Sequence, residues 1–203
     1  MSSPSEFFNR LFSRLDKTLW GSTGEVIARP SAHAVMENAF QEDSTYLLWL
    51  AEVITGDSAR ARQCVIDARL ISEQHSGLFV DWLAQWARTS TIMHAIGDSR
   101  TEIMLASQIY QERHCPHGGH APTTTEQIMQ LRQLPAEEIV RSLDAFVRAI
   151  ALLRGVSHCA LQDCALRLGT TRYAVAAASC ELDRWLHSPA VTHQRGFHGM
   201  HLA

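Results

Sequence analysis

Histidine and cysteine, the side chains best suited to binding zinc, gather in one short stretch of the sequence. His114, Cys115, His117 and His120 lie within seven residues of one another, and imidazole and thiolate groups are zinc ligands. Structural zinc sites, however, place pairs of ligands on separate elements, and no second pair lies close to this stretch. The surrounding proline and glycine residues favour a solvated linker, so we predict no metal site and no cofactor.

The cysteines are the second group of residues that could do chemistry. Five of them, an odd number, lie mostly in apolar, helix-like surroundings: Cys64, Cys115, Cys159, Cys164 and Cys180. This usage is typical of a reduced, cytoplasmic compartment. Cys159 and Cys164 lack the spacing of a redox pair, so buried helical thiols are the favoured interpretation and redox sensing has no motif to support it.

The patterns of the common enzyme classes do not occur in the sequence. Gly118-Gly119 does not open a helix after a strand, as a phosphate-binding loop would. No pair of carboxylates shares a helical face with a histidine, as acid–base catalysis would favour. We therefore expect a protein that is not an enzyme.

The pattern around Gly169 predicts a helix-turn-helix unit. A glycine suits the turn between the two helices, and Ala165, four residues earlier, is small enough to let them approach closely. Thr170 or Thr171 can cap the second helix with its hydroxyl group. Apolar residues of both helices recur at intervals of three and four: Cys164, Leu168, Val175, Ala178, Leu182 and Trp185. The alternative is an ordinary pair of helices joined by a glycine C-cap.

Helical spacing of apolar residues extends over nearly the whole chain, and strand signals are scarce. We predict an all-α fold with two small helical domains, a sigma-like one at 33–113 and a helix-turn-helix domain at 126–187, joined by a linker at 114–125. An N-terminal amphipathic helix and linker (1–32) and a disordered tail (188–203) complete the chain. The amphipathic helix would dock on a neighbouring domain or a partner, or lie on a membrane surface, but no run is long enough to span a membrane.

Two blocks of the sequence resemble the extracytoplasmic-function type of RNA polymerase sigma factors. The block from Ala149 to Thr171 is similar to their promoter-reading domain, in which a Leu-Arg pair, here Leu153-Arg154, precedes the helix-turn-helix. The block from Tyr46 to Ala61 is similar to their polymerase-binding domain, where a helix stops at a Thr-Gly-Asp turn. Gly56 suits the left-handed C-cap of that turn, and Asp57 or Ser58 suits the next N-cap. The resemblance implies RNA polymerase core and promoter DNA as partners.

The resemblance also implies which residues contact those partners. The start of the second helix of the unit reaches base edges, so Arg172 can pair with guanine, and Tyr173 can touch phosphate or a thymine methyl group. The predicted DNA-binding residues are Arg167, Thr170, Thr171, Arg172, Tyr173 and Arg184. Asp67 keeps the acidic character of the polymerase-contacting helix and is the predicted polymerase-binding residue.

Some positions depart from the family's usual charges. Arg60, Arg62 and Gln63 replace residues that are usually acidic, and a guanidinium group would repel a basic partner surface. Cations that usually contact phosphate are replaced by Ala176, Ala178 and Glu181, in a chain of net charge −3.

We therefore hold two hypotheses. The first is a divergent sigma-like protein that docks on RNA polymerase and binds promoter DNA. The second is a sigma-fold interaction module that has lost promoter binding and acts through a regulatory protein partner or self-association.

Overall fold

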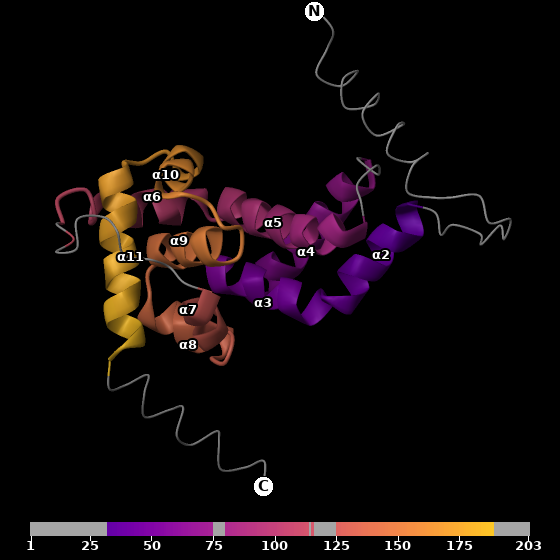
Figure 1. The fold of residues 1–203 in the computed structure, drawn as a ribbon, viewed down its shortest axis with the longest axis horizontal. Helices are drawn as coiled ribbons and strands as arrows, with labels where there is room; N and C mark the ends of the chain where they lie inside the picture. Colours follow the sequence, from indigo (N-terminus) through magenta and orange to yellow (C-terminus); the bar gives the residue numbers. More distant parts are fainter. Residues whose placement is uncertain (1–31, 75–79, 114, 116–124, 189–203) are drawn as a thin grey trace, which may run out of the picture. The chain divides into compact units, whose positions relative to one another are not determined.

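The computed structural model describes residues 32–74, 80–113, 115 and 125–188, which all belong to the compact unit Ser31–Ala203. These residues form helices and no strands (Figure 1), which confirms the predicted all-α class for this part of the chain. The predicted N-terminal amphipathic helix and nearly all of the predicted linker and tail lie outside the described residues. No described helix is long and apolar enough to cross a membrane. The helices, in chain order, are α2 (Ala32–Glu42), α3 (Ser44–Thr55), α4 (Ser58–Gln74), α5 (Val80–Asp98), α6 (Arg100–Gln108), α7 (Thr125–Leu131), α8 (Ala136–Ser142), α9 (Ala145–Gly155), α10 (Leu161–Leu168) and α11 (Arg172–Leu186).

Helices α3, α4 and α5 pack against one another, and α2 packs on the same group. Helix α3 ends where the Thr-Gly-Asp turn was predicted, because Gly56 adopts a left-handed conformation with φ of 71° and its N–H bonds to the carbonyl of Glu52. A Cβ atom is disfavoured in this region of backbone space. The carboxylate of Asp57 then accepts a hydrogen bond from the N–H of Arg60 at 2.8 Å, which confirms Asp57 as the cap of α4.

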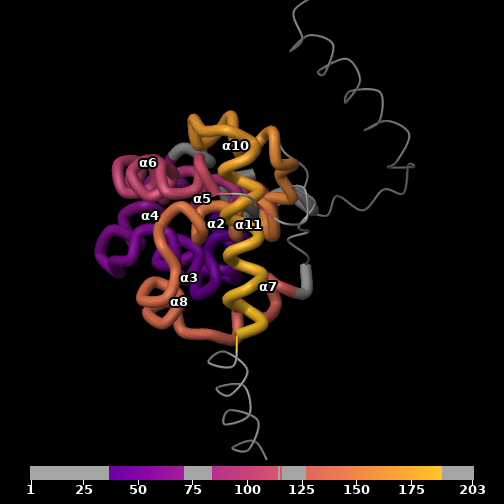
Figure 2. Tube along the Cα trace, turned by 90° about the vertical axis from the view of Figure 1, so that its left-hand side faces the viewer, coloured from indigo at the N-terminus to yellow at the C-terminus, as the bar shows by residue number. Residues whose placement is uncertain are grey.

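Helices α10 and α11 are joined by a short turn at Gly169, which both the helix-turn-helix prediction and its alternative, a pair of helices with a glycine C-cap, require. Gly169 ends α10 with φ of 66°, and the hydroxyl of Thr171 caps α11 by accepting a hydrogen bond from the N–H of Ala174 at 3.2 Å. Of the residues predicted to face inward, five are buried and Trp185 is only partly buried; the five are Cys164, Leu168, Val175, Ala178 and Leu182. Ala165, the small residue predicted where the helices approach, is buried too. Figure 2 shows α11 running lengthwise along the outside of the helices against which it packs.

Helix α9 packs against helices of both predicted domains, because it contacts α3, α5 and α6 as well as α7, α10 and α11. Figure 1 shows it between α11 and the group that contains α3 and α5. Every residue from Ala145 to Leu153 is buried. The helices of the two predicted domains therefore share one continuous hydrophobic core, and their division into two domains stays a prediction.

A buried arginine lies at the contact between α9 and α3. The side chain of Arg148 is 8% exposed, and its Nη1 donates a hydrogen bond of 2.8 Å to the carbonyl oxygen of Val53. That oxygen belongs to the last turn of α3, where carbonyl groups lack helical partners and the helix dipole favours a cation. Burial lowers the pKa of the Arg148 guanidinium, whereas the carboxylates of Asp144 and Glu102 act in the opposite direction.

Two further bonds join the same groups of helices. The indole N–H of Trp49 on α3 donates to the carbonyl oxygen of Leu134 at 3.2 Å. The side-chain amide of Gln85 on α5 donates to the carbonyl oxygen of Val156 at 2.8 Å. These bonds and the Arg148 bond use backbone carbonyl groups as acceptors. They therefore fix the position of α3 and α5 relative to the chain that surrounds α9.

We expect Arg148→Met to lower the free energy of unfolding by about 1–3 kcal/mol, because the carbonyl of Val53 then lies buried without its donor. Methionine retains most of the apolar stem, so the loss reports the hydrogen bond rather than a cavity. Chemical denaturation of the full chain measures the effect. Arg141→Ala is the matched control, since Arg141 is 73% exposed and its ion pair with Glu137 lies on the surface. An equal loss in both variants would contradict the role given to Arg148.

The conformation of Gly169 predicts opposite effects for two alanine substitutions. A Cβ atom would meet nothing within 4 Å at either Gly169 or Gly97, but only Gly169 has a positive φ, of 66°. Gly169→Ala should destabilise the protein by about 1 kcal/mol through backbone strain. Gly97→Ala, inside α5, should stabilise it by roughly 0.5–1 kcal/mol through helix propensity. Thermal unfolding of both variants tests this, and a stabilising Gly169→Ala would refute it.

Candidate functional site

The first turn of α11 is the part of the helix-turn-helix unit that the structure leaves open. Thr171, Arg172 and Tyr173 are exposed, and the ring of Tyr173 has 69% of its surface accessible. The guanidinium of Arg172 lies 5.4 Å from the centre of that ring. Thr171 already uses its hydroxyl as the helix cap. Arg172 and Tyr173 therefore form the exposed polar and aromatic surface at this end of α11.

The other predicted DNA-binding residues have different surroundings. Arg167 on α10 is exposed, but its Nη1 lies 3.4 Å from the sulfur of Met93 on α5. Thr170 is half-buried, and its hydroxyl oxygen is buried without a hydrogen-bond partner. Arg184 is paired at 2.5 Å with Glu181, one turn earlier on α11. Arg172 and Arg184 are twelve residues apart on one helix, which separates them by about 18 Å. The structure thus brings Arg172 and Tyr173 together and separates Arg172 from Arg184 along α11.

The middle of α11 is enclosed. All seven residues from Ala174 to Cys180 are buried, whereas a helix that lies in the major groove presents side chains of one face to the bases. Of the positions where the family usually has cations, Ala176 and Ala178 are buried. Glu181 is half-buried between Arg184 and Arg113, whose guanidinium lies 3.5 Å from its carboxylate.

A disulfide bond joins Cys180 of α11 to Cys115, with 6.1 Å between the two Cα atoms. This bond differs from the expectation of reduced cysteines. The sequence gives no sign of it, because 65 residues separate the two cysteines and no local pattern relates them. Cys64, Cys159 and Cys164 are free thiols. Cys164 is fully buried, as predicted, and Cys159 is only partly so. Burial and the nearby Cys159 raise the pKa of Cys164 to about 12.

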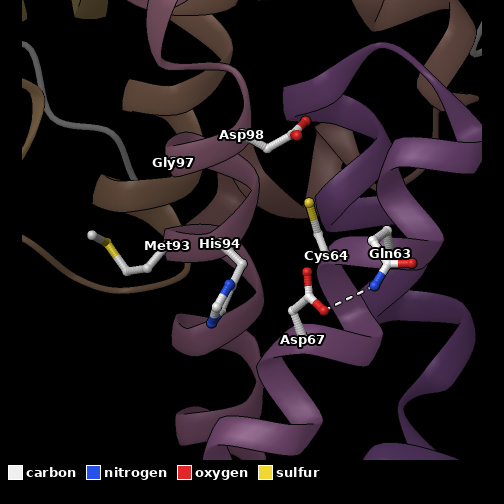
Figure 3. A pocket seen from close by; sticks show the side chains of 7 residues that line it. All are labelled: Gln63, Cys64, Asp67, Met93, His94, Gly97 and Asp98. Carbon is white, nitrogen blue, oxygen red and sulfur yellow. Dashed lines mark hydrogen bonds between the residues drawn. The ribbon is translucent and has the colours of Figure 1, made fainter.

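A cleft of about 440 Å³ lies between α4 and α5 (Figure 3), lined by Gln63, Cys64, Asp67, Met93, His94, Gly97 and Asp98. The predicted polymerase-binding residue Asp67 lies here, half-buried, and accepts a hydrogen bond of 2.9 Å from the amide of Gln63. Burial raises the pKa of the Cys64 thiol to about 11, and the charges of Asp98 and Asp67 add to this effect. A thiol with such a pKa is protonated at neutral pH and is a poor nucleophile.

Arg60 does not present a free charge on α4. Its guanidinium binds the carboxylate of Asp98 at 2.7 Å and that of Glu102 at 3.2 Å, and the hydrogen bond with Asp98 raises the pKa of Arg60. The repulsion expected from Arg60 is therefore offset within the chain itself. Arg62 and Gln63 are exposed on α4.

The outer face of α4 carries two large apolar side chains. Ile66 is 51% exposed and Leu70 is 52% exposed, and residues four apart lie on one face of a helix. Gln63 and Asp67 lie on the same side, so this face runs along the cleft. We call Gln63, Ile66, Asp67 and Leu70 the α4 face. The signal for it in the sequence is a second apolar stripe beside the inward one formed by Ala61, Cys64 and Ala68.

Among the residues that the structure describes, no group of histidine, cysteine, aspartate and glutamate side chains could hold a metal ion. His114, His117 and His120 of the histidine-rich stretch lie outside the described residues. Comparison of the chain with known protein families, curated proteins and solved structures finds no match. The function must therefore be argued from the residues themselves.

Proposed function

We propose that this chain is a sigma-like protein-interaction module that docks on a protein partner through the α4 face. The observation that carries the proposal is the pair of half-exposed apolar side chains, Ile66 and Leu70, beside a cleft that contains Asp67. The resemblance to sigma factors, which rests on the Tyr46–Ala61 and Ala149–Thr171 blocks, names RNA polymerase core as the partner. The module works in the cytoplasm, where that partner is found, and needs no cofactor.

The chemistry of the α4 face indicates what such a partner must offer. Covering the exposed parts of Ile66 and Leu70 contributes roughly 1 kcal/mol for each side chain, which is too little for a stable complex without further contacts. The carboxylate of Asp67 in the neighbouring cleft can accept a basic side chain, and the exposed Arg62 can pair with an acidic one. A helix that carries apolar residues between charged ones fits this surface.

DNA reading by α11 is the second candidate function, and the exposure of Arg172 and Tyr173 favours it. The first residues of a recognition helix are those that reach base edges. The ion pair between Arg184 and Glu181 and the burial of Ala174–Cys180 support the interaction module instead. These features reduce the number of cations and of side chains that could face a duplex.

The docking proposal is tested with core RNA polymerase from the same organism and the full chain. We expect Ile66→Asp and Leu70→Asp each to weaken binding at least about tenfold, because a carboxylate would be buried against an apolar partner surface. Equilibrium binding of a fluorescently labelled chain measures the effect. Both positions are half-exposed, so thermal unfolding should change little.

Met129→Asp is the matched control, because Met129 on α7 is 59% exposed and lies outside the α4 face. It should bind like the unchanged chain. Loss of binding in Met129→Asp together with normal binding in Ile66→Asp would place the interface elsewhere. Failure of the unchanged chain to bind the polymerase would reject this partner.

The DNA hypothesis predicts a difference between two arginines of the same helix. If the first turn of α11 reads DNA, Arg172→Ala should weaken binding to duplexes selected from a random pool and reduce the salt dependence by about one phosphate contact. Arg184→Ala should have a smaller effect, since Glu181 offsets part of that charge. Gel-shift titrations at several salt concentrations measure both. If no duplex is enriched at low salt, promoter reading by the isolated protein is excluded.

A further inference from the structure

On the outward face of α11, which points away from the hydrophobic core, the middle residues are buried and the end residues are exposed. Ala176 is 4% exposed and Cys180 is 8% exposed, yet neither belongs to the continuous hydrophobic core that Val175, Ala178 and Leu182 of the same helix help to form. Tyr173 and Arg184 lie one turn before Ala176 and one turn after Cys180, and both are largely exposed. Residues at these intervals share one face of a helix. Another part of the chain must therefore lie over this face between Tyr173 and Arg184.

Contacts identify residues 110–113 and Cys115, which follow α6, as a cover of that face. Cys115 is bonded to Cys180, and the guanidinium of Arg113 lies 3.5 Å from the carboxylate of Glu181 and 5.0 Å from the centre of the Tyr110 ring. Two of these contacts, Cys115–Cys180 and Arg113–Glu181, join the segment to α11, and the third lies within the segment itself. We call these residues the clasp segment.

The two ends of the clasp segment are held in different ways. At the α6 end, Tyr110 is 3% exposed, its hydroxyl donates to Asp144 Oδ2 at 2.5 Å, and its ring lies 5.5 Å from that of Phe146. At the other end, the side chain of Arg113 is 52% exposed, and exposed ion pairs hold chains together only weakly. Among the contacts of the described residues, the disulfide bond is therefore the main connection between that end and α11.

We propose that the Cys115–Cys180 bond is a redox-responsive clasp that controls access to the outward face of α11. When the bond is formed, the clasp segment stays against Cys180 and Glu181. When it is reduced, Tyr110 keeps its end of the segment in place, while Cys115 and Arg113 move away and uncover the middle of α11. This inference is independent of docking through the α4 face, and it concerns the face that a helix-turn-helix unit presents to its partner.

The chemistry of the clasp is thiol–disulfide exchange with a low-molecular-weight disulfide. The thiolate of Cys115, the more accessible of the two sulfurs, attacks the small disulfide and displaces one small thiolate. The thiolate of Cys180 then attacks Cys115 Sγ in the mixed disulfide and displaces the second. The two cysteines lose two electrons and two protons, and the small disulfide gains them as two thiols. A small dithiol reverses both steps and is itself oxidised to a disulfide.

Amide hydrogen exchange of the full chain, in glutathione disulfide and in dithiothreitol, tests the clasp. We expect reduction to speed exchange at least about tenfold in residues 110–113 and around Ala176–Arg184, and to leave α3 unchanged. Peptide mass analysis should find the Cys115–Cys180 cross-link only in the oxidised sample. Equal exchange in both samples, or no such cross-link after oxidation, would overturn the proposal.

Cysteine variants separate the clasp from general effects of oxidation. Cys115→Ser should exchange like the reduced protein in both buffers, and Cys180→Ala, which keeps a small apolar group at the buried position, should do the same. Cys159→Ser is the matched control, because Cys159 is a partly exposed free thiol, and it should respond to reduction as the unchanged chain does. A response in Cys115→Ser, or its absence in Cys159→Ser, would also overturn the proposal. None of these readouts depends on polymerase binding, so the two proposals can fail separately.

Discussion

The guanidinium of Arg148 at the end of α3 is the contact on which the arrangement of this protein depends. A buried cation needs acceptors with a defined direction, and the carbonyl of Val53 supplies one at 2.8 Å. This bond favours one rotation of α9 relative to α3, within the apolar core that the two helices share. Helices α10 and α11 pack on α9, so they are joined to α3 through the same helix.

The features that the sequence predicts correctly are those with local causes. Gly56 and Gly169 each end a helix by adopting the left-handed conformation that glycine tolerates best. Asp57 and Thr171 cap the helices that follow, one and two residues further along the chain. Contacts between distant residues have no such signature. Arg148 and Val53 are 95 residues apart, and Cys115 and Cys180 are 65 apart. Only the folded arrangement of the helices brings these pairs together.

The effect of each charged side chain at the candidate site also depends on distant residues, which the sequence alone does not reveal. The resemblance assigns a role to each arginine from its position in the chain, but the effect of a guanidinium on a partner depends on its neighbours. Arg60 is paired with Asp98 and Glu102, and Arg184 with Glu181, which also lies 3.5 Å from Arg113. Arg172 contacts an uncharged aromatic ring instead. The pattern of residue types therefore overstates both the repulsion at α4 and the attraction along α11.

The alanine-rich run of α11 has a physical explanation other than the loss of DNA-binding side chains. Ala174, Ala177 and Ala178 belong to the hydrophobic core, while Ala176 is buried outside it. A helix that is packed on more than one face needs small side chains, because neighbouring segments must approach its backbone closely. Longer side chains at Ala176 would not fit beneath the part of the chain that buries it. The small residues of α11 are thus the ones that allow the helix to be enclosed.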